Sequence, residues 1–218
     1  MRQRRADTGA RRGHDLGALH HDPIRARIAA EAARLISETG LRDYALAKRK
    51  AAARLGVNDE SALPKNVEID AALREYQRLF HADDQPQRLR MLRETAIEAM
   101  RFFSAFEPRL VGAVLDGTAD EHSAVCLHLF SDDPDAPARH LDEHGIDYET
   151  ETRRLRFDRE DETDFPVLQF VADDAAIDVT IFAYDGLRQA PLDRIDGRPM
   201  QRAAAASVQR LLNEETAR

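Results

Sequence analysis

The sequence has little cysteine and no long apolar run, and both absences limit what the protein can be. Cys126 is the only cysteine among 218 residues, so the chain can form neither an internal disulfide nor a zinc site built from several cysteines. A single cysteine fits a reducing cytoplasm, where we expect the protein to reside. No apolar run approaches the roughly 20 residues that a bilayer-spanning helix needs, so we expect no membrane association.

Basic charge is also scarce for a protein that coats nucleic acid. The net charge of −8 favours solubility and argues against a general DNA- or RNA-coating role. A local basic patch is still compatible with this net charge. Five arginines within the first twelve residues are not followed by an apolar core, so we expect no secretory signal there. We interpret residues 1–21 as a disordered basic tail.

The first half of the chain has the apolar periodicity of helices. Residues at three- or four-residue spacing predict a helix from Pro23 to a stop at Gly40, and further helices over 43–55, 69–80 and 86–106. We treat residues 22–107 as one helical segment. Its third and fourth helices have long apolar faces, and each such face must be buried against another element.

The second half changes to the period of strands. We predict strands over 110–115, 124–130, 148–157, 166–171 and 176–182, a short helix over 134–145 and a last helix over 199–213. The prediction is therefore an α+β protein, with the helical segment packed on a mixed sheet of about five strands (108–218) and a C-terminal helix. We expect the third and fourth helices to cover the sheet face that bears Val125, Leu127 and Leu129, which would make residues 22–218 one cooperative unit.

Polar residues interrupt two of the predicted strands. His128 lies on the same strand face as Cys126, and Asp178 lies opposite the apolar face of its own strand. Gly112 precedes them, in the first strand of the pair. Nucleotidyl transfer needs carboxylates at two alternate positions of one strand and a third on a neighbouring strand, because together they hold two divalent cations. A glycine before the first pair lets the backbone approach phosphates closely.

Residues 95–185 resemble the core of the nucleotidyltransferase superfamily. The superfamily pattern is a hydrophobic residue with Gly-Gly or Gly-Ser, then Asp-hydrophobic-Asp/Glu-hydrophobic, and a third acid inside a later strand. Here residues 111–113 (VGA) precede residues 126–129 (CLHL), and Asp178 stands at the third-acid position. The resemblance implies a nucleotidyltransferase-like fold in which Cys126 and His128 replace both leading acids.

The chain as a whole is also similar to proteobacterial proteins of about this length. They share segments such as residues 43–57 (DYALAKRKAAARLGV) and 109–119 (RLVGAVLDGTA), and some carry the label of UDP-N-acetylmuramate–alanine ligase. The sequence does not support that activity. Such a ligase needs a glycine-rich phosphate loop ending in Gly-Lys-Ser/Thr, and the chain contains none.

With one acid instead of three, we expect no metal site and no cofactor beyond weak Mg²⁺ held together with a nucleotide. The resemblance implies a catalytically degenerate nucleotidyltransferase-like protein that binds a nucleotide, RNA or protein partner. The candidate ligand-binding residues are Gly112, His128, Asp178 and Arg198, and no catalytic residue is assigned. An active nucleotidyltransferase with an atypical site is one alternative. The simpler interpretations of His128 and Cys126 are a hydrogen-bonded histidine and a small buried hydrophobe.

A second alternative starts from residues 27–57, which resemble the first two helices of a TetR-type repressor. A recognition helix should follow at once. Residues 58–66 (NDESALPKN) are instead acidic and contain Pro64. In this hypothesis the protein is a DNA-binding regulator that docks on phosphates through a basic helix face consisting of Lys48, Arg49, Lys50 and Arg54.

Overall fold

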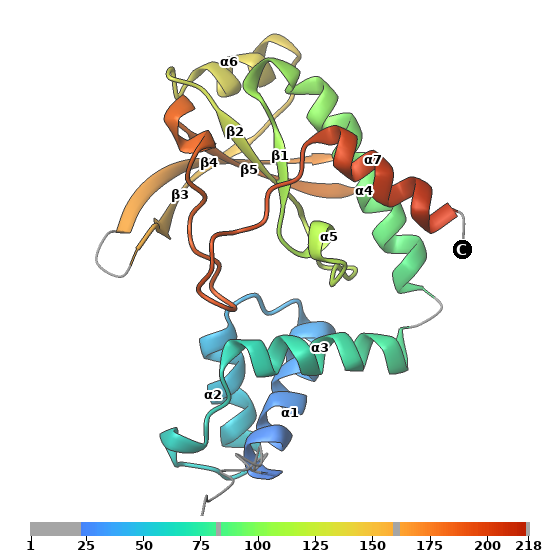
Figure 1. Cartoon of the computed structure of the whole chain (residues 1–218), viewed down its shortest axis with the longest axis vertical. Coiled ribbons are helices and arrows are strands. Elements are labelled where there is room, and N and C mark those ends of the chain that lie inside the picture. Colours follow the sequence, from blue (N-terminus) through green and yellow to red (C-terminus); the bar gives the residue numbers. More distant parts are fainter. Residues whose placement is uncertain (1–22, 82–83, 159–161, 217–218) are drawn as a thin grey trace, which may run out of the picture.

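A computed structural model describes residues 23–81, 84–158 and 162–216, and within them the protein is an α+β fold, as predicted (Figure 1). The expected tail at 1–21 lies outside these residues. The α-helices are α1 (Pro23–Thr39), α2 (Tyr44–Arg54), α3 (Asn66–Phe80), α4 (Gln85–Phe102), α5 (Ala113–Asp116), α6 (Ala136–Glu143) and α7 (Ala205–Thr216). The strands are β1 (Arg109–Val111), β2 (Val125–Phe130), β3 (Glu149–Arg156), β4 (Glu162–Ala172) and β5 (Ala175–Phe182). None of the helices in these ranges combines the length and apolarity needed to cross a bilayer.

The five strands form one mixed sheet. Their order is β1-β2-β5-β4-β3, with β2 and β5 parallel and every other neighbouring pair antiparallel. The helix α6 and the β3–β4 hairpin lie between β2 and β5 in sequence, which gives the chain room for a parallel return. The predicted mixed sheet of about five strands is confirmed.

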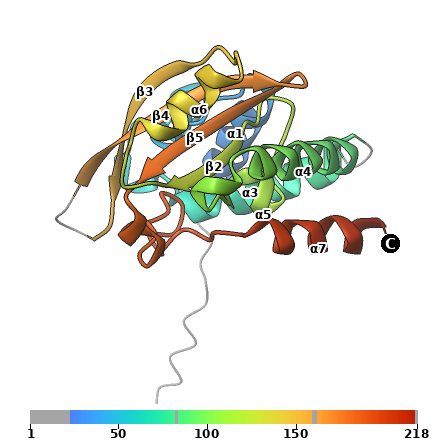
Figure 2. The ribbon, with the colours of Figure 1, turned by 90° about the horizontal axis from the view of Figure 1, so that it is seen from above.

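One face of this sheet is buried beneath helices. Val125, Leu127 and Leu129 of β2 are fully buried in a cluster that also contains residues of α4 and α7. Figure 2 shows α7 lying along α4 on this side of the sheet. Phe103, at the C-terminal end of α4, is fully buried in the same cluster. The predicted packing of the fourth helix on the face that bears Val125 is therefore confirmed.

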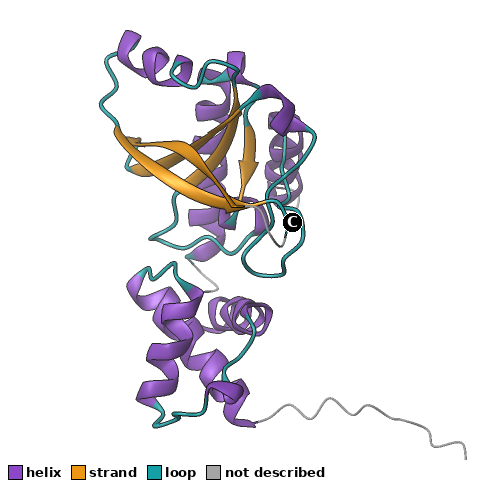
Figure 3. Ribbon diagram, turned by 90° about the vertical axis from the view of Figure 1, so that its left-hand side faces the viewer, coloured by secondary structure: helices purple, strands orange, loops and turns teal. Residues whose placement is uncertain are grey.

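The third helix does not cover the sheet, so that part of the prediction is wrong. Ile69 and Leu73 of α3 are buried in a second cluster with residues of α1 and α2, such as Ile28. These three helices form a unit of their own beside the sheet (Figure 3). The physical reason is that α1 and α2 each offer an apolar face close to α3 along the chain, whereas α4 and α7 already cover the sheet.

The three-helix unit meets the rest of the protein through polar contacts. Consecutive backbone carbonyls of residues 116–119 accept hydrogen bonds from Arg74 and Gln77 of α3 and from Gln85 of α4, at 2.8–3.3 Å. Gly40, which ends α1 with a φ of 66°, approaches His122 so closely that an added Cβ would lie 2.8 Å from the ring. Hydrogen bonds to the 116–119 loop, from α3 on one side and from α4 on the other, therefore join these two hydrophobic clusters.

Among the predicted elements whose bounds differ in the structure, two bear on the site. The expected strand over 110–115 stops at Val111, because Gly112 has a φ of 70° and starts the short helix α5. The expected helix over 199–213 begins only at Ala205. Residues before it are extended, since the backbones of Leu110 and Ala203 exchange hydrogen bonds of 2.8 and 2.9 Å along the outer edge of β1.

Candidate ligand-binding cavity at the sheet

The strands that bear the candidate residues are neighbours in the sheet. Cys126 lies opposite Asp178 in the parallel β2–β5 pair, and His128 lies opposite Thr180. Side chains directly opposite each other in a sheet share a face, so His128 and Asp178 lie on the same face, as predicted. Gly112 lies at the end of β1 beside them, where an added Cβ would be 4.0 Å from Cβ of Cys126.

This face lines a cavity of about 470 Å³. Three of the four candidate residues line it: Gly112, His128 and Asp178. The other walls come from the three-helix unit and from the loop after β5, through Arg42, Tyr44, Leu192, Asp193, Arg194, Ile195 and Met200. The cavity therefore lies where sheet, helical unit and C-terminal loop converge.

Asp178 is held by an arginine that the sequence did not single out. Arg153 of β3 donates from Nη1 and Nη2 to the two carboxylate oxygens at 2.6 and 2.7 Å, and Nη1 also donates to Thr180 Oγ1 at 3.1 Å. Gln169 Nε2 adds a bond of 3.1 Å to Oδ2. These hydrogen bonds raise the pKa of the Arg153 guanidinium. Both oxygens of Asp178 are thus occupied by protein donors, in the two-pronged geometry that suits an arginine–carboxylate pair.

His128 is occupied in the same way. Its Nδ1 accepts a hydrogen bond of 3.0 Å from Nε of Arg202, so the ring proton must reside on Nε2. The Arg202 guanidinium also stacks over the rings of Phe130 and Phe182, 5.0 Å from each centroid. Burial, with the charges of Arg202 and Arg153, lowers the pKa of His128 to about 3. His128 is therefore neutral, and it does not present a cation to a phosphate at ordinary pH.

Cys126 is half-buried and has the properties of an unreactive thiol. Burial, reinforced by the Asp178 charge, raises its pKa to about 11. Its Sγ makes a long contact of 3.7 Å to the carbonyl of Ala124. A nucleophilic cysteine needs the opposite, a lowered pKa beside a base or cation. This environment favours the interpretation of Cys126 as a small hydrophobe.

Arg198, the fourth candidate, does not line the cavity. Its side chain is 84% exposed and has only a loose ion pair of 3.9 Å with Asp196. The sequence analysis did not predict Arg153 and Arg202, which hydrogen-bond Asp178 and His128 at this face. One signal existed for Arg153, because period-two alternation in β3 puts it on the same face as the apolar Leu155. No periodic signal existed for Arg202, which lies in the extended segment before α7.

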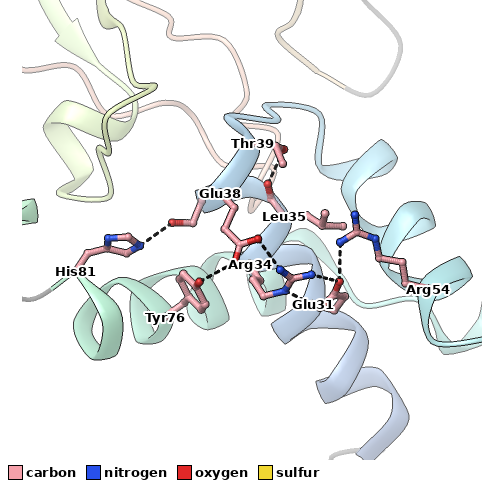
Figure 4. A network of polar contacts seen from close by, with 9 residues as sticks. Glu31, Arg34, Leu35, Glu38, Thr39, Arg54, Tyr76 and His81 are labelled. Atoms are coloured by element: carbon pink, nitrogen blue, oxygen red, sulfur yellow. Dashed lines mark hydrogen bonds and ion pairs between the residues drawn. The ribbon is translucent and has the colours of Figure 1, made fainter.

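The basic face of α2 is partly occupied by contacts within the three-helix unit. Lys48 donates to the carbonyl of Pro64 at 2.8 Å, and Arg54 pairs with Glu31 at 3.1 Å (Figure 4). Residues 55–65 separate α2 from α3, which is far longer than the three- or four-residue turn of a helix-turn-helix motif. These features do not favour the repressor-like alternative.

Searches against protein families, curated proteins and solved structures found no match to this chain. We therefore interpret the cavity from its own residues. Within the described ranges, no group of three or more His, Cys, Asp or Glu side chains is arranged to hold a metal ion. The exposed Arg42 and Arg194 bring positive charge to the cavity, Asp193 brings negative charge, and Tyr44 and Met200 add apolar surface. Such a lining can bind an anionic ligand that also has an apolar part.

Proposed function

We propose that the protein is a catalytically degenerate, nucleotidyltransferase-like protein that binds a nucleotide in this cavity without metal-dependent transfer. The observation that carries the proposal is the two-pronged Arg153–Asp178 pair. A catalytic carboxylate must offer free oxygens to a divalent cation. At the third-acid position, a guanidinium instead contacts both carboxylate oxygens. In an active nucleotidyltransferase, metal ions supply positive charge at this position, whereas here the Arg153 guanidinium supplies it.

The relationship to the nucleotidyltransferase fold is supported by position. Gly112 follows the first strand of an antiparallel pair, Cys126 and His128 alternate on the second strand, and Asp178 lies on the parallel neighbour. These are the relative places that the superfamily pattern assigns to the glycine and the three acids. We propose the loss of nucleotidyl transfer because Cys126 and His128 stand where the pattern has its two leading acids.

A nucleotide suits the cavity better than a larger partner does. Its volume of about 470 Å³ lies within the roughly 300–1,000 Å³ typical of small-molecule sites. Arg42 and Arg194 can each donate to phosphate oxygens, because a guanidinium retains its charge at any physiological pH. Tyr44 and Met200 offer surface for a base. An RNA end is the alternative occupant that the same residues would admit.

The test is calorimetric titration of the full chain with ATP, GTP, CTP and UTP, with and without Mg²⁺. We expect at least one nucleotide to bind with a micromolar dissociation constant that changes little when Mg²⁺ is removed. Arg194→Gln should weaken that binding by about tenfold or more, because it removes a charge-assisted hydrogen bond. Arg198→Gln is the matched control, since it changes the same residue type in the same loop outside the cavity, and it should leave binding unchanged.

Two results would contradict the proposal. If the protein bound a short single-stranded RNA and none of the four nucleotides, the ligand of the cavity would be RNA rather than a nucleotide. Mg²⁺-dependent transfer of a labelled nucleotide, abolished by Asp178→Ala and retained by Arg198→Gln, would show that the site is active.

A further inference from the structure

The outer edge of β3 is the free edge of the sheet. At the opposite margin, β1 is covered by its backbone hydrogen bonds to Ala203, whereas β3 has β4 as its one strand partner among the residues that the structure describes (Figure 1). Near the end of β3, the carbonyl of Arg156 accepts a hydrogen bond of 2.6 Å from the backbone of Leu192. In the described residues, the backbone of 149–155 has no strand beside it on that side. An edge of this kind can pair with another strand.

The charges along β3 complement those of the same strand running in the opposite direction. Its sequence, ETETRRLR, has both acids in the first half and all three arginines in the second. An antiparallel copy therefore places an acidic half beside a basic half. Each of these arginines also pairs with an acid of its own chain, namely Asp178, Asp164 and Glu162, so the second copy adds to contacts that the edge already has.

Hydrogen-bond geometry restricts the possible registers, and charge then favours one of them. In an antiparallel ladder, alternate residues direct their N–H and C=O to the same side, so the outward carbonyl of Arg156 implies that Thr150, Thr152 and Arg154 also face outward. Outward residues can only lie opposite outward residues. The register centred on Thr152 meets this condition. It also places Glu151 of each copy directly opposite Arg153 of the other copy, which gives two such pairs. The next allowed register, centred on Arg153, would oppose two arginines.

We propose that two copies of this chain associate through β3, antiparallel and centred on Thr152, to form one continuous ten-stranded sheet. About six backbone hydrogen bonds would join residues 150–154 of the two copies. Directly opposite residues share a face, so the two cavities open on the same face of the joined sheet. Each copy places Glu151 beside the arginine that holds Asp178 in the other. The contact is small, which makes the association weak and dependent on concentration.

The first test is a cysteine crosslink in the full chain. At the centre of the register, the two copies of Thr152 lie opposite each other with Cα atoms about 5.5 Å apart, within disulfide range. Thr152→Cys should therefore give a covalent dimer under mild oxidation. Arg154→Cys is the matched control and should not, because Arg154 faces Thr150 of the other copy. The native protein should stay uncrosslinked, since its only cysteine lies on β2 in the cavity wall rather than on the outer edge of β3.

The second test is sedimentation velocity over a concentration series. The native chain at about 100 μM should show an average mass between those of monomer and dimer. Glu151→Arg should weaken the association by at least tenfold, because two attractive contacts become repulsive. Glu121→Arg makes the same charge change at an exposed position outside β3 and should have no effect. A native chain that stays monomeric, or equal crosslinking by Arg154→Cys and Thr152→Cys, would overturn the proposal.

Discussion

Replacing Arg153 with methionine tests the contact on which the proposed function depends. The substitution keeps the aliphatic stem and removes three hydrogen bonds, two to Asp178 at 2.6 and 2.7 Å and one to Thr180 at 3.1 Å. Asp178 is 7% exposed, so its carboxylate would stay buried with Gln169 as its remaining side-chain donor. Breaking a buried ion pair by removing one partner usually costs 3–5 kcal/mol. We expect about 3 kcal/mol here, because the Arg153 side chain is 28% exposed and water offsets part of the loss.

The assay is urea unfolding followed by far-ultraviolet circular dichroism. Arg154→Met is the matched control, because Arg154 is the next residue of β3 and pairs with Asp164 on the open surface. It should leave the midpoint of unfolding unchanged. The double variant Arg153→Met/Asp178→Leu should recover much of the loss and give a coupling energy of about 2 kcal/mol in a double-mutant cycle. Equal stability of the Arg153→Met and Arg154→Met proteins would refute the reasoning.

Three further predictions concern the core, metal ions and pH. Phe103→Ala should lower the free energy of unfolding by about 3–5 kcal/mol, because the ring is fully buried. Phe103→Ala and Ile69→Ala, which lies in the cluster of the three-helix unit, should both shift one and the same thermal transition. Two separate transitions in calorimetry would contradict one cooperative unit. Titration calorimetry without nucleotide should detect no Mg²⁺ or Mn²⁺ binding tighter than about 1 mM, and a micromolar site that Asp178→Ala removes would contradict the occupied carboxylate. The pKa of His128 is about 3 in the folded protein and about 6.5 in the unfolded chain. Between pH about 3 and about 6.5, the unfolded chain therefore binds a proton that the folded protein does not. The His128 contribution to stability is therefore full above pH about 6.5 and falls, by up to about 1.4 kcal/mol per pH unit, as the pH decreases toward 3; an equal pH dependence of unfolding in His128→Gln would contradict this.

Local sequence patterns predicted most of the fold and part of the site. The helix expected over 43–55 is present as α2, and Asp43 caps it with hydrogen bonds to two backbone amides, a local interaction that this residue type favours. Period-two alternation correctly placed His128 and Asp178 on one face. The end of the first strand at Gly112 was missed, since a glycine can either continue a strand or leave it at positive φ.

The sequence by itself determined which residues are apolar at which spacing, and hence the α+β class and the faces of the strands, because these depend on neighbours along the chain. Only the tertiary structure decided which partners those faces meet. Arg153 reaches Asp178 from β3, across the intervening strand β4, and this depends on a strand order that no local pattern encodes. In the same way, α3 packs on α1 and α2 rather than on the sheet. Its apolar face could have been buried against either surface, and the helix pattern alone does not distinguish them. Contacts between residues distant in sequence follow from packing of the whole chain, and the candidate site is built almost entirely from such contacts.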